Sequence, residues 1–417
     1  SAQGFPPSFS VGTTCAGAMP IDSLQLETSS YTLYGRKFEV PRRYSIVNVC
    51  GVNCAAQDLV ADERCAIKKI EGVFDRLSAA KRTLRELRIL RHLRHENLAD
   101  VTSIFLPGAK GDFEDLYVIS GVMRTDLAAI LRSEQALSHE HTQFFLYQTL
   151  RGMKYVHSAG VVHRYLEPRS LLVNEACDLR ISGFGLAQVS FGGEGLQARA
   201  PAEGYVSKGR RWYRAPEALC SWARCDGAVD VWSIGCIFAE MLVRWPLFPG
   251  HNVERQLQLI VALLGTPSGE ELDAIPSEQC RRIVDSLPYS EGRCQERFAE
   301  TSEEAFDLLR TMLQFGPRQR ATVPQALEHP YMGKLFCPED EPARDALEAS
   351  DFEFERRELD VRALREELFQ EALHYHPDTR ERYVQEQRGL GPWRYSPKTY
   401  PLLAPGEPPC SPEEEEE

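Results

Sequence analysis

The segment 231–242 is apolar on almost every face of a helix, and it most constrains what this 417-residue chain can fold into. Its apolar residues include Trp232, Ile237 and Phe238, which lie at different angles around a helix axis. A surface helix carries one apolar stripe, so a helix that is apolar all round is buried. We therefore expect a large, mainly helical domain whose core is built around this segment.

Strand-like patterns precede most of the helical patterns along the chain. Residues 44–70 are strand-like, and alternation near their end places Ala66 and Lys68 on one face of a strand. Residues 116–119 predict another strand. Further helices are predicted over residues 78–93 with Ser78 as the N-cap, over residues 138–157 with Ser138 as the N-cap, and over residues 359–373. This order predicts an α+β fold, in which a small lobe with strands adjoins a larger helical lobe.

Composition argues against several classes of partner. The formal net charge of −13 opposes bulk attraction to nucleic acid or anionic lipid. No apolar run approaches the roughly 18 residues that a membrane span needs, and no signal-peptide pattern is visible at the start of the sequence. The twelve cysteines include no Cys-x-x-Cys pair, which favours reduced thiols over a zinc site or disulfides. We therefore predict a cytosolic or nuclear protein that binds neither nucleic acid nor membranes.

A series of short motifs occurs in order at residues 66–68 (AIK), 83–87 (TLREL), 162–164 (VHR), 171–174 (LLVN), 183–187 (GFGLA), 211–217 (RWYRAPE), 230–233 (DVWS), 265–267 and 329–331 (HPY). Any one of these motifs is weak evidence, whereas the ordered series makes chance resemblance negligible. Together, over residues 43–375, they resemble the eukaryotic protein kinases, and specifically the mitogen-activated protein (MAP) kinase family.

The resemblance implies a bilobal protein-kinase-like fold, with a small β-rich N-lobe that contains one main helix and a larger, mainly helical C-lobe. Composition predicts a flexible start and a disordered, Pro-rich and acidic end. The expected parts are a flexible N-terminal extension (1–42), the N-lobe (43–123), the C-lobe (124–332), a C-terminal extension that packs on the lobes and carries an acidic docking patch (333–376), and the tail (377–417).

The resemblance also implies which residues contact a nucleotide. Lys68 matches the lysine that holds the phosphates, and Glu86 matches the carboxylate that holds this lysine in place. The glycine-rich loop that covers the phosphates is reduced, because residues 49–54 keep a single glycine. The other expected contacts are Ala66, Met123, the ribose-contacting Asp126, and Leu172.

Four working positions of the catalytic machinery differ from the family pattern. Tyr165 replaces the aspartate that accepts the proton of the substrate hydroxyl, and Glu167 replaces a lysine that contacts the transferred phosphate. Ser170 and Gly183 replace the two ligands of magnesium. With an unperturbed pKa of about 10, roughly one tyrosine in a thousand is ionised at pH 7, so a tyrosine is a poor base. Magnesium prefers carboxylate and phosphate oxygens, which these two positions do not supply.

These departures predict a MAP-kinase-like pseudokinase, which acts as a signalling scaffold, decoy or allosteric partner with little or no phosphoryl transfer. This interpretation favours a protein that is not an enzyme and that requires no cofactor. Such a protein binds ATP weakly if at all and is not expected to bind Mg²⁺. The alternative is an active, ATP-dependent serine/threonine kinase that modifies residues beside proline and uses unorthodox catalytic residues. Its best support is the retention of Lys68 and Glu86. The sequence predicts no oligomeric state.

The activation segment carries Glu203-Gly204-Tyr205 where the family has a Thr-x-Tyr pair that an upstream kinase phosphorylates. The permanent carboxylate of Glu203 is expected to pair with Arg164 of the catalytic loop and to hold the segment without phosphorylation. The alternative is a solvated loop glutamate. Tyr205 stays available for phosphorylation.

Glu217 and Arg320 match the buried ion pair of the family, and Asp230 is retained in its motif. Removing one partner of such a pair leaves an uncompensated buried charge. The retention of all three residues therefore predicts a normally folded C-lobe.

Residues 337–342 resemble the acidic docking patch of the family, with Glu339 and Asp340 as the docking acids. The expected partners are signalling proteins with basic docking motifs, among them upstream kinases or MAP kinase substrates. A solvated charge run is the alternative.

Overall fold

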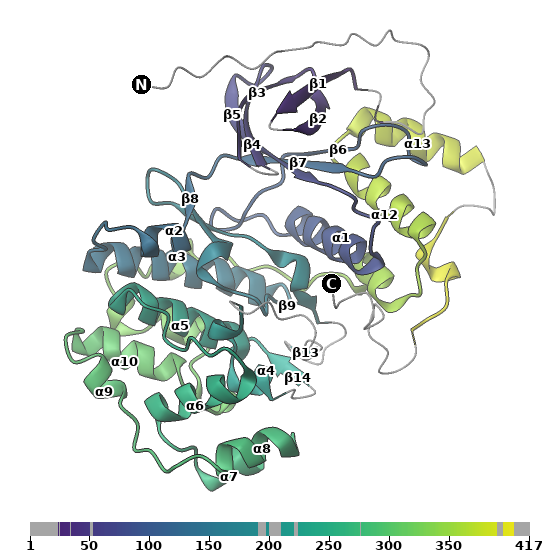
Figure 1. Cartoon of the computed structure of the whole chain (residues 1–417). Coiled ribbons are helices and arrows are strands. Elements are labelled where there is room, and N and C mark those ends of the chain that lie inside the picture. Colours follow the sequence, from purple (N-terminus) through teal and green to yellow (C-terminus); the bar gives the residue numbers. More distant parts are fainter. Residues whose placement is uncertain are drawn as a thin grey trace. The chain divides into compact units, whose positions relative to one another are not determined.

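The computed structural model of the chain describes residues 24, 26–33, 35–50, 53–190, 197–199, 210–220, 224–275, 277–389 and 395–403. These residues fall into two compact units, whose elements are labelled in Figure 1. Within the described residues, the small unit comprises those up to 91 together with 100–122 and 353–403, and the large unit comprises 92–99 and 123–352. A β-rich small unit and a mainly helical large unit confirm the predicted α+β, bilobal class.

An antiparallel sheet is the main feature of the small unit, with the strand order β3-β4-β5-β7-β6. Its strands are β3 (Tyr44–Cys50), β4 (Asn53–Asp58), β5 (Glu63–Ile70), β6 (Ser103–Phe105) and β7 (Leu116–Gly121). The alternation predicted for β5 is confirmed, because Cys65 and Ile67 are buried whereas Lys68 is exposed. Lys68 therefore projects from the opposite face of the strand to its core side chains.

Strands β1 (Thr28–Leu33) and β2 (Arg36–Pro41) form an antiparallel hairpin in the small unit. For residues 28–41, this hairpin corrects the prediction that residues 1–42 are a flexible extension. Phe38 and Val40 alternate along β2, and both are fully buried. Their burial gives the hairpin the apolar face that a stable pair of strands needs.

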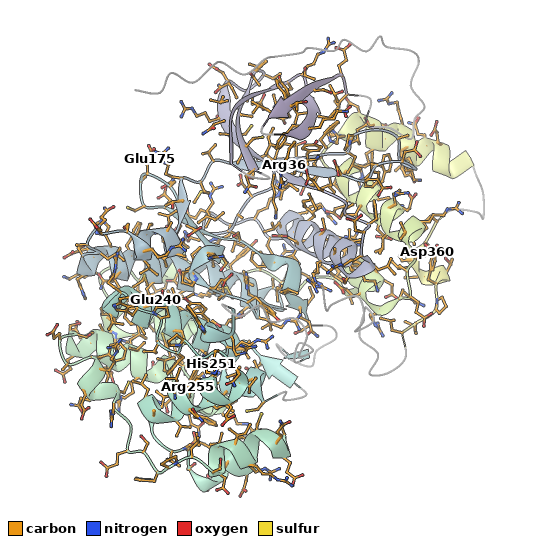
Figure 2. The ribbon with its side chains drawn as sticks, viewed as in Figure 1. Arg36, Glu175, Glu240, His251, Arg255 and Asp360 are labelled. Atoms are coloured by element: carbon orange, nitrogen blue, oxygen red, sulfur yellow. The ribbon has the colours of Figure 1, made fainter. Side chains whose placement is uncertain are left out.

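Three helices belong to the small unit: α1 (Leu77–His92), α12 (Val361–Leu373) and α13 (Pro377–Gly389). Ser78 is buried inside the first turn of α1, so it is not the N-cap that the sequence predicted. Asp360, labelled in Figure 2, caps α12, because its carboxylate accepts a backbone N–H of the first turn at 2.7 Å.

Helix α13 corrects the prediction that the chain is disordered from residue 377 onward. The helix begins at Pro377, and a proline loses nothing in a first turn, where its missing N–H has no partner. The ring of Tyr383 packs against that of Phe369 on α12, with centroids 5.5 Å apart. This contact gives α13 a buried face, which a disordered tail lacks.

Helix α5 (Ala228–Val243) forms the core of the large unit, and its Trp232 and Phe238 side chains are fully buried, as its apolar pattern predicted. Ser138 caps α3 (His139–Ser158), also as predicted. The remaining helices are α2 (Leu127–Arg132), α4 (Pro216–Leu219), α6 (Val253–Leu264), α7 (Gly269–Asp273), α8 (Glu278–Asp285), α9 (Cys294–Arg297), α10 (Glu303–Met312) and α11 (Val323–Leu327). None of the described helices is long and apolar enough to cross a membrane.

Short strands and 3-10 turns complete the large unit. The strands are β8 (Thr125–Asp126), β9 (Val161–Val162), β10 (Leu171–Val173), β11 (Leu179–Ile181), β12 (Gln188–Val189), β13 (Gln197–Arg199) and β14 (Arg224–Asp226). The turns used below are η1 (Pro168–Ser170), η2 (Phe184–Leu186), η4 (Arg210–Tyr213) and η7 (Pro338–Asp340). Strands β8, β10 and β11 form a three-stranded sheet in the order β11-β10-β8.

Several boundaries differ from the predicted parts of the chain, and Met123, the last residue of the predicted N-lobe, belongs to the large unit. Residues 92–99 belong to the large unit rather than to the N-lobe, because Leu98 forms a β-bridge with Ile181. The predicted extension 333–376 is divided between the units after Phe352.

Candidate active site

Lys68 lies on the central strand β5 of the small unit, with Ala66 on the same face, and its side chain is exposed. Glu86 lies on α1 and is half-buried. Within the part of the chain that the structure describes, no ion pair joins these two residues, so the implied pairing is not formed here. The next residue along β5, Lys69, faces the other way and pairs with Asp115 at 2.8 Å.

The arginine-bearing face of α1 is paired with acids of α12 in the same unit. Arg88 donates to Glu367 and to Glu371, each at 2.9 Å. Burial opposes the ionisation of Glu371, but the guanidinium groups of Arg88 and Arg91 outweigh it and lower the pKa of this carboxyl. The orientation of α1, and with it the position of Glu86, therefore depends on α12.

A C-terminal strap, defined here as residues 395–403, contacts one of the acids in this group of ion pairs. The Tyr395 hydroxyl donates to the second carboxylate oxygen of Glu367 at 2.9 Å. A β-bridge between Arg357 and Leu402 holds the other end of the strap. The acid that binds α1 is thus itself held in place by the end of the described chain.

Three predicted nucleotide contacts lie in the large unit. Leu172 of β10 lies directly opposite Asp126 of β8, and Met123 precedes β8 and is half-buried. The Asp126 carboxylate caps α2 by accepting the N–H of Ala129 at 2.8 Å. The sheet therefore brings Asp126 and Leu172 together, and the cap fixes the carboxylate.

The catalytic loop is held by Asp230 of α5, which is fully buried. Its carboxylate accepts the backbone N–H groups of His163 at 2.8 Å and Arg164 at 2.7 Å, and His157 Nε2 lies 2.8 Å from it. Arg164 has a left-handed backbone, with φ at 68°, a strained conformation that this double hydrogen bond holds. Asp230 therefore has the structural role that the family resemblance implied.

Tyr165 follows directly, at the position of the family's catalytic base. Its hydroxyl accepts a hydrogen bond from Arg214 Nη2 at 2.7 Å, and the guanidinium carbon lies 5.3 Å from the centroid of its ring. Arg214 is 8% exposed. The phenol therefore lies against a buried cation, where the family pattern has a carboxylate.

The two family positions for magnesium ligands do not fit the ion. The Ser170 hydroxyl donates to the Glu167 carbonyl at 2.7 Å and accepts the Glu167 N–H at 3.1 Å, which commits it to the turn η1. Gly183 offers no side chain, and its left-handed φ of 87° disfavours any other residue. Among the described residues, no group of three or more His, Cys, Asp or Glu could hold a metal.

The predicted pairing of Arg164 with Glu203 lies outside the described residues, as does Tyr205. Within them, the Arg164 guanidinium donates to the Leu186 carbonyl at 2.8 Å and to the Gln188 side chain at 3.0 Å. These bonds direct Arg164 toward the start of the activation segment.

Glu217 and Arg320 form the predicted ion pair, with two parallel hydrogen bonds, the second at 2.7 Å. Both side chains are almost fully buried. The bidentate geometry adds orientation to the charge attraction.

The predicted docking acids Glu339 and Asp340 lie in the turn η7, and both are exposed. Arg151 donates to the backbone carbonyl of Asp340 at 2.6 and 2.9 Å, which fixes the turn. The adjoining Glu341 is buried and pairs with Lys154 at 2.7 Å. The patch therefore presents two acids rather than three.

Sequence reasoning missed two polar residues of the large unit, Arg214 beside Tyr165 and Glu240 beside Tyr213. Arg214 was noted only as part of a motif, and Glu240 of α5, labelled in Figure 2, was not noted. Glu240 is buried and accepts the Tyr213 hydroxyl at 2.6 Å, and burial raises the pKa of its carboxyl. A charged residue inside the largely apolar segment 231–242 was the available signal for Glu240.

A sheet-rich small unit, a large unit built on α5 and a loop held by Asp230 define a protein kinase fold. The model of the protein kinase domain family matches residues 50–332. Extracellular signal-regulated kinase 1 of Dictyostelium discoideum is 44% identical over 84% of this chain, which spans 66% of that protein. Mitogen-activated protein kinase 1 of Oryza sativa subsp. japonica is 41% identical over 87% of this chain and 92% of its own length. Mitogen-activated protein kinase 6 of Arabidopsis thaliana is 42% identical over 84% of this chain and 87% of its own length. The chain belongs to the MAP kinase family.

These relatives correct two predictions. The sequence favoured a chain that leans away from enzyme activity and does not bind Mg²⁺, whereas the matched relatives are named as kinases. Protein kinases transfer the γ-phosphoryl group of ATP with the help of Mg²⁺. Changed side chains alone do not establish lost activity, because kinase catalysis is mostly positioning and electrostatic stabilisation, which other groups can supply.

Proposed function

We propose that this chain is a serine/threonine protein kinase of the MAP kinase type, which transfers the γ-phosphoryl group of ATP to a serine or threonine beside proline. The observation that carries the proposal is the catalytic loop, whose backbone Asp230 holds at two N–H groups. Relatives named as kinases support it. Because phosphoryl transfer is mainly a matter of positioning, a retained frame keeps the largest part of the machinery.

We assign Lys68 to the phosphates of ATP and Asp126 to its ribose, with Ala66, Met123 and Leu172 as further nucleotide contacts. The family resemblance supports these assignments, and so does the exposed position of Lys68 on β5. No step is assigned to a metal ion, because the two family ligand positions do not fit one.

The test is transfer of radiolabel from γ-labelled ATP to Ser-Pro and Thr-Pro peptides, with a divalent cation present. Wild-type protein should label the peptides, and Lys68→Met should abolish labelling. Lys37→Met is the matched control, because Lys37 is an exposed lysine on β2 of the same unit. Absence of labelling by the wild type would refute the proposal, and equal labelling by Lys68→Met would trace the activity to a contaminant.

A second function, as a signalling scaffold or allosteric partner, is favoured by the exposure of Glu339 and Asp340 on a fixed turn. Such acids suit basic docking motifs of upstream kinases or substrates. Reversing both charges to lysine should weaken binding of a basic peptide about tenfold, with a loss that shrinks at high salt. Glu278→Lys on the exposed surface of α8 is the control. Unchanged affinity in the double variant would exclude this patch as the docking site.

A further inference from the structure

Arg214 is a buried cation whose pairing is incomplete. Its side chain is among the buried polar groups of the large unit, and Nη2 donates to the Tyr165 hydroxyl at 2.7 Å. Its Nε is buried and has no hydrogen-bond partner, and among the described residues no carboxylate forms an ion pair with it. Arg211 lies in the turn η4, which ends directly before Arg214, and burial together with the charge of Arg214 lowers the pKa of Arg211. A buried guanidinium with an unsatisfied Nε and no carboxylate partner among the described residues leaves Arg214 incompletely compensated.

The direction of the Arg214–Tyr165 hydrogen bond determines what the phenol can do. A guanidinium only donates, so the Tyr165 oxygen is the acceptor and its own proton remains for another acceptor. Among the described residues, none accepts a hydrogen bond from this hydroxyl. A hydroxyl that accepts from a cation donates more strongly in turn, because hydrogen bonds in a chain polarise one another.

We propose that Arg214 and Tyr165 form a donor relay, in which Arg214 orients and polarises the Tyr165 hydroxyl and that hydroxyl donates to an oxygen of the phosphoryl group during transfer. The inference rests on the proposed kinase function. The relay replaces the lysine that the family has at the position of Glu167. Arg214 is the positioning residue, and Tyr165 is the group that meets the reacting atoms.

The relay changes which group handles the substrate proton. The bond between the γ-phosphorus and the oxygen that bridges it to the β-phosphorus breaks, and ADP leaves with the electron pair. The oxygen of the substrate hydroxyl forms the new bond to phosphorus, and its proton passes to water. Tyr165 keeps its own proton throughout, so it acts as an electrostatic stabiliser and not as a base.

Tyr165→Phe tests the relay, because it removes the hydroxyl and keeps the ring. Loss of one such donor typically lowers kcat by about 10²–10³. We expect a fall of that size, with KM for ATP and for a Ser-Pro peptide changed less than about twofold. Tyr289→Phe, at a phenol that is 78% exposed in the same unit, should leave all three constants unchanged. A purely structural role for Tyr165 would lower the melting temperature without this split between kcat and KM.

The pH profile separates a donor from a base. The relay predicts a kcat for the wild type that is flat between pH 6.5 and 8.5, whereas a phenol acting as base would give about a tenfold rise per pH unit. A rising profile, or a Tyr165→Phe enzyme that keeps more than half of the wild-type kcat, would overturn the relay and leave the kinase function standing. A wild type that labels no peptide would overturn both.

Discussion

Replacing Glu217 by glutamine removes the charge that neutralises the buried guanidinium of Arg320. The two side chains are 2% and 0% exposed, so water cannot take over this role. Glutamine keeps the shape of the side chain and one acceptor oxygen. The guanidinium also keeps hydrogen bonds to the backbone carbonyls of Gln314, Ala228 and Phe315, at 2.8, 3.0 and 3.0 Å.

Removing one partner of a buried ion pair costs about 3–5 kcal/mol, because the other charge stays buried and uncompensated. The three carbonyls, and a Trp232 ring centroid 4.9 Å from the Arg320 guanidinium, partly compensate the remaining charge. We therefore expect a loss at the lower end, about 3 kcal/mol. In a unit of this size about 2–4 °C are lost per kcal/mol, so the melting temperature should fall by about 6–12 °C.

Thermal unfolding followed by circular dichroism measures this shift for the full chain. Glu278→Gln is the matched control, because its pair with Arg282 is exposed on both sides and such pairs contribute at most about 1 kcal/mol. If Glu217→Gln melts within about 2 °C of this control, the assignment of a buried, uncompensated charge is wrong.

Two further changes test the strap and one buried histidine. Tyr395→Phe removes a donor to Glu367, which should cost the small unit about 1–3 kcal/mol and speed hydrogen exchange in α12, while unchanged exchange would refute the contact. Burial, aided by the charge of Arg151, lowers the pKa of His95 to about 4. Because the unfolded state binds a proton near pH 6.5 and the folded state does not, the free energy of unfolding should be constant above pH 6.5, fall between pH 6.5 and about 4, and level off below. His95→Gln should flatten this slope in urea titrations across pH, and an unaltered slope would assign it to other groups.

Helices and strands with a strong hydrophobic pattern were predictable from the sequence. Those whose composition resembles that of loops were not. Helix α5 was evident because almost every residue is apolar, and β5 because its burial alternates. The β1–β2 hairpin was missed because its Ser- and Thr-rich sequence resembles a loop, although Phe38 and Val40 mark its buried face. Helix α13 was missed because the Pro-rich and acidic composition after residue 377 indicated disorder, whereas a proline is favourable where a helix begins.

The catalytic loop shows what motifs can and cannot supply. Motif order assigned Tyr165, Ser170 and Gly183 to family positions, and the structure places them in or beside the loop and turns η1 and η2. Side-chain pairing did not follow from order, since Arg214 reaches Tyr165 from 49 residues away. The implied pairing of Lys68 with Glu86 failed for the same reason: a motif fixes the residue and its strand or helix, while a contact also depends on how those elements pack.

The ion pairs between α1 and α12 determine when the small unit can finish folding during synthesis. Arg88 leaves the ribosome early, but its partner Glu371 follows 283 residues later. At about 5–20 residues per second, the guanidinium waits roughly 15–60 s for its acid. During that interval the nascent small unit must keep this arginine in water, while residues 123–352 emerge and can close their own core first. Strands β1 and β2 are therefore part of a unit that is completed only after α12 has been made.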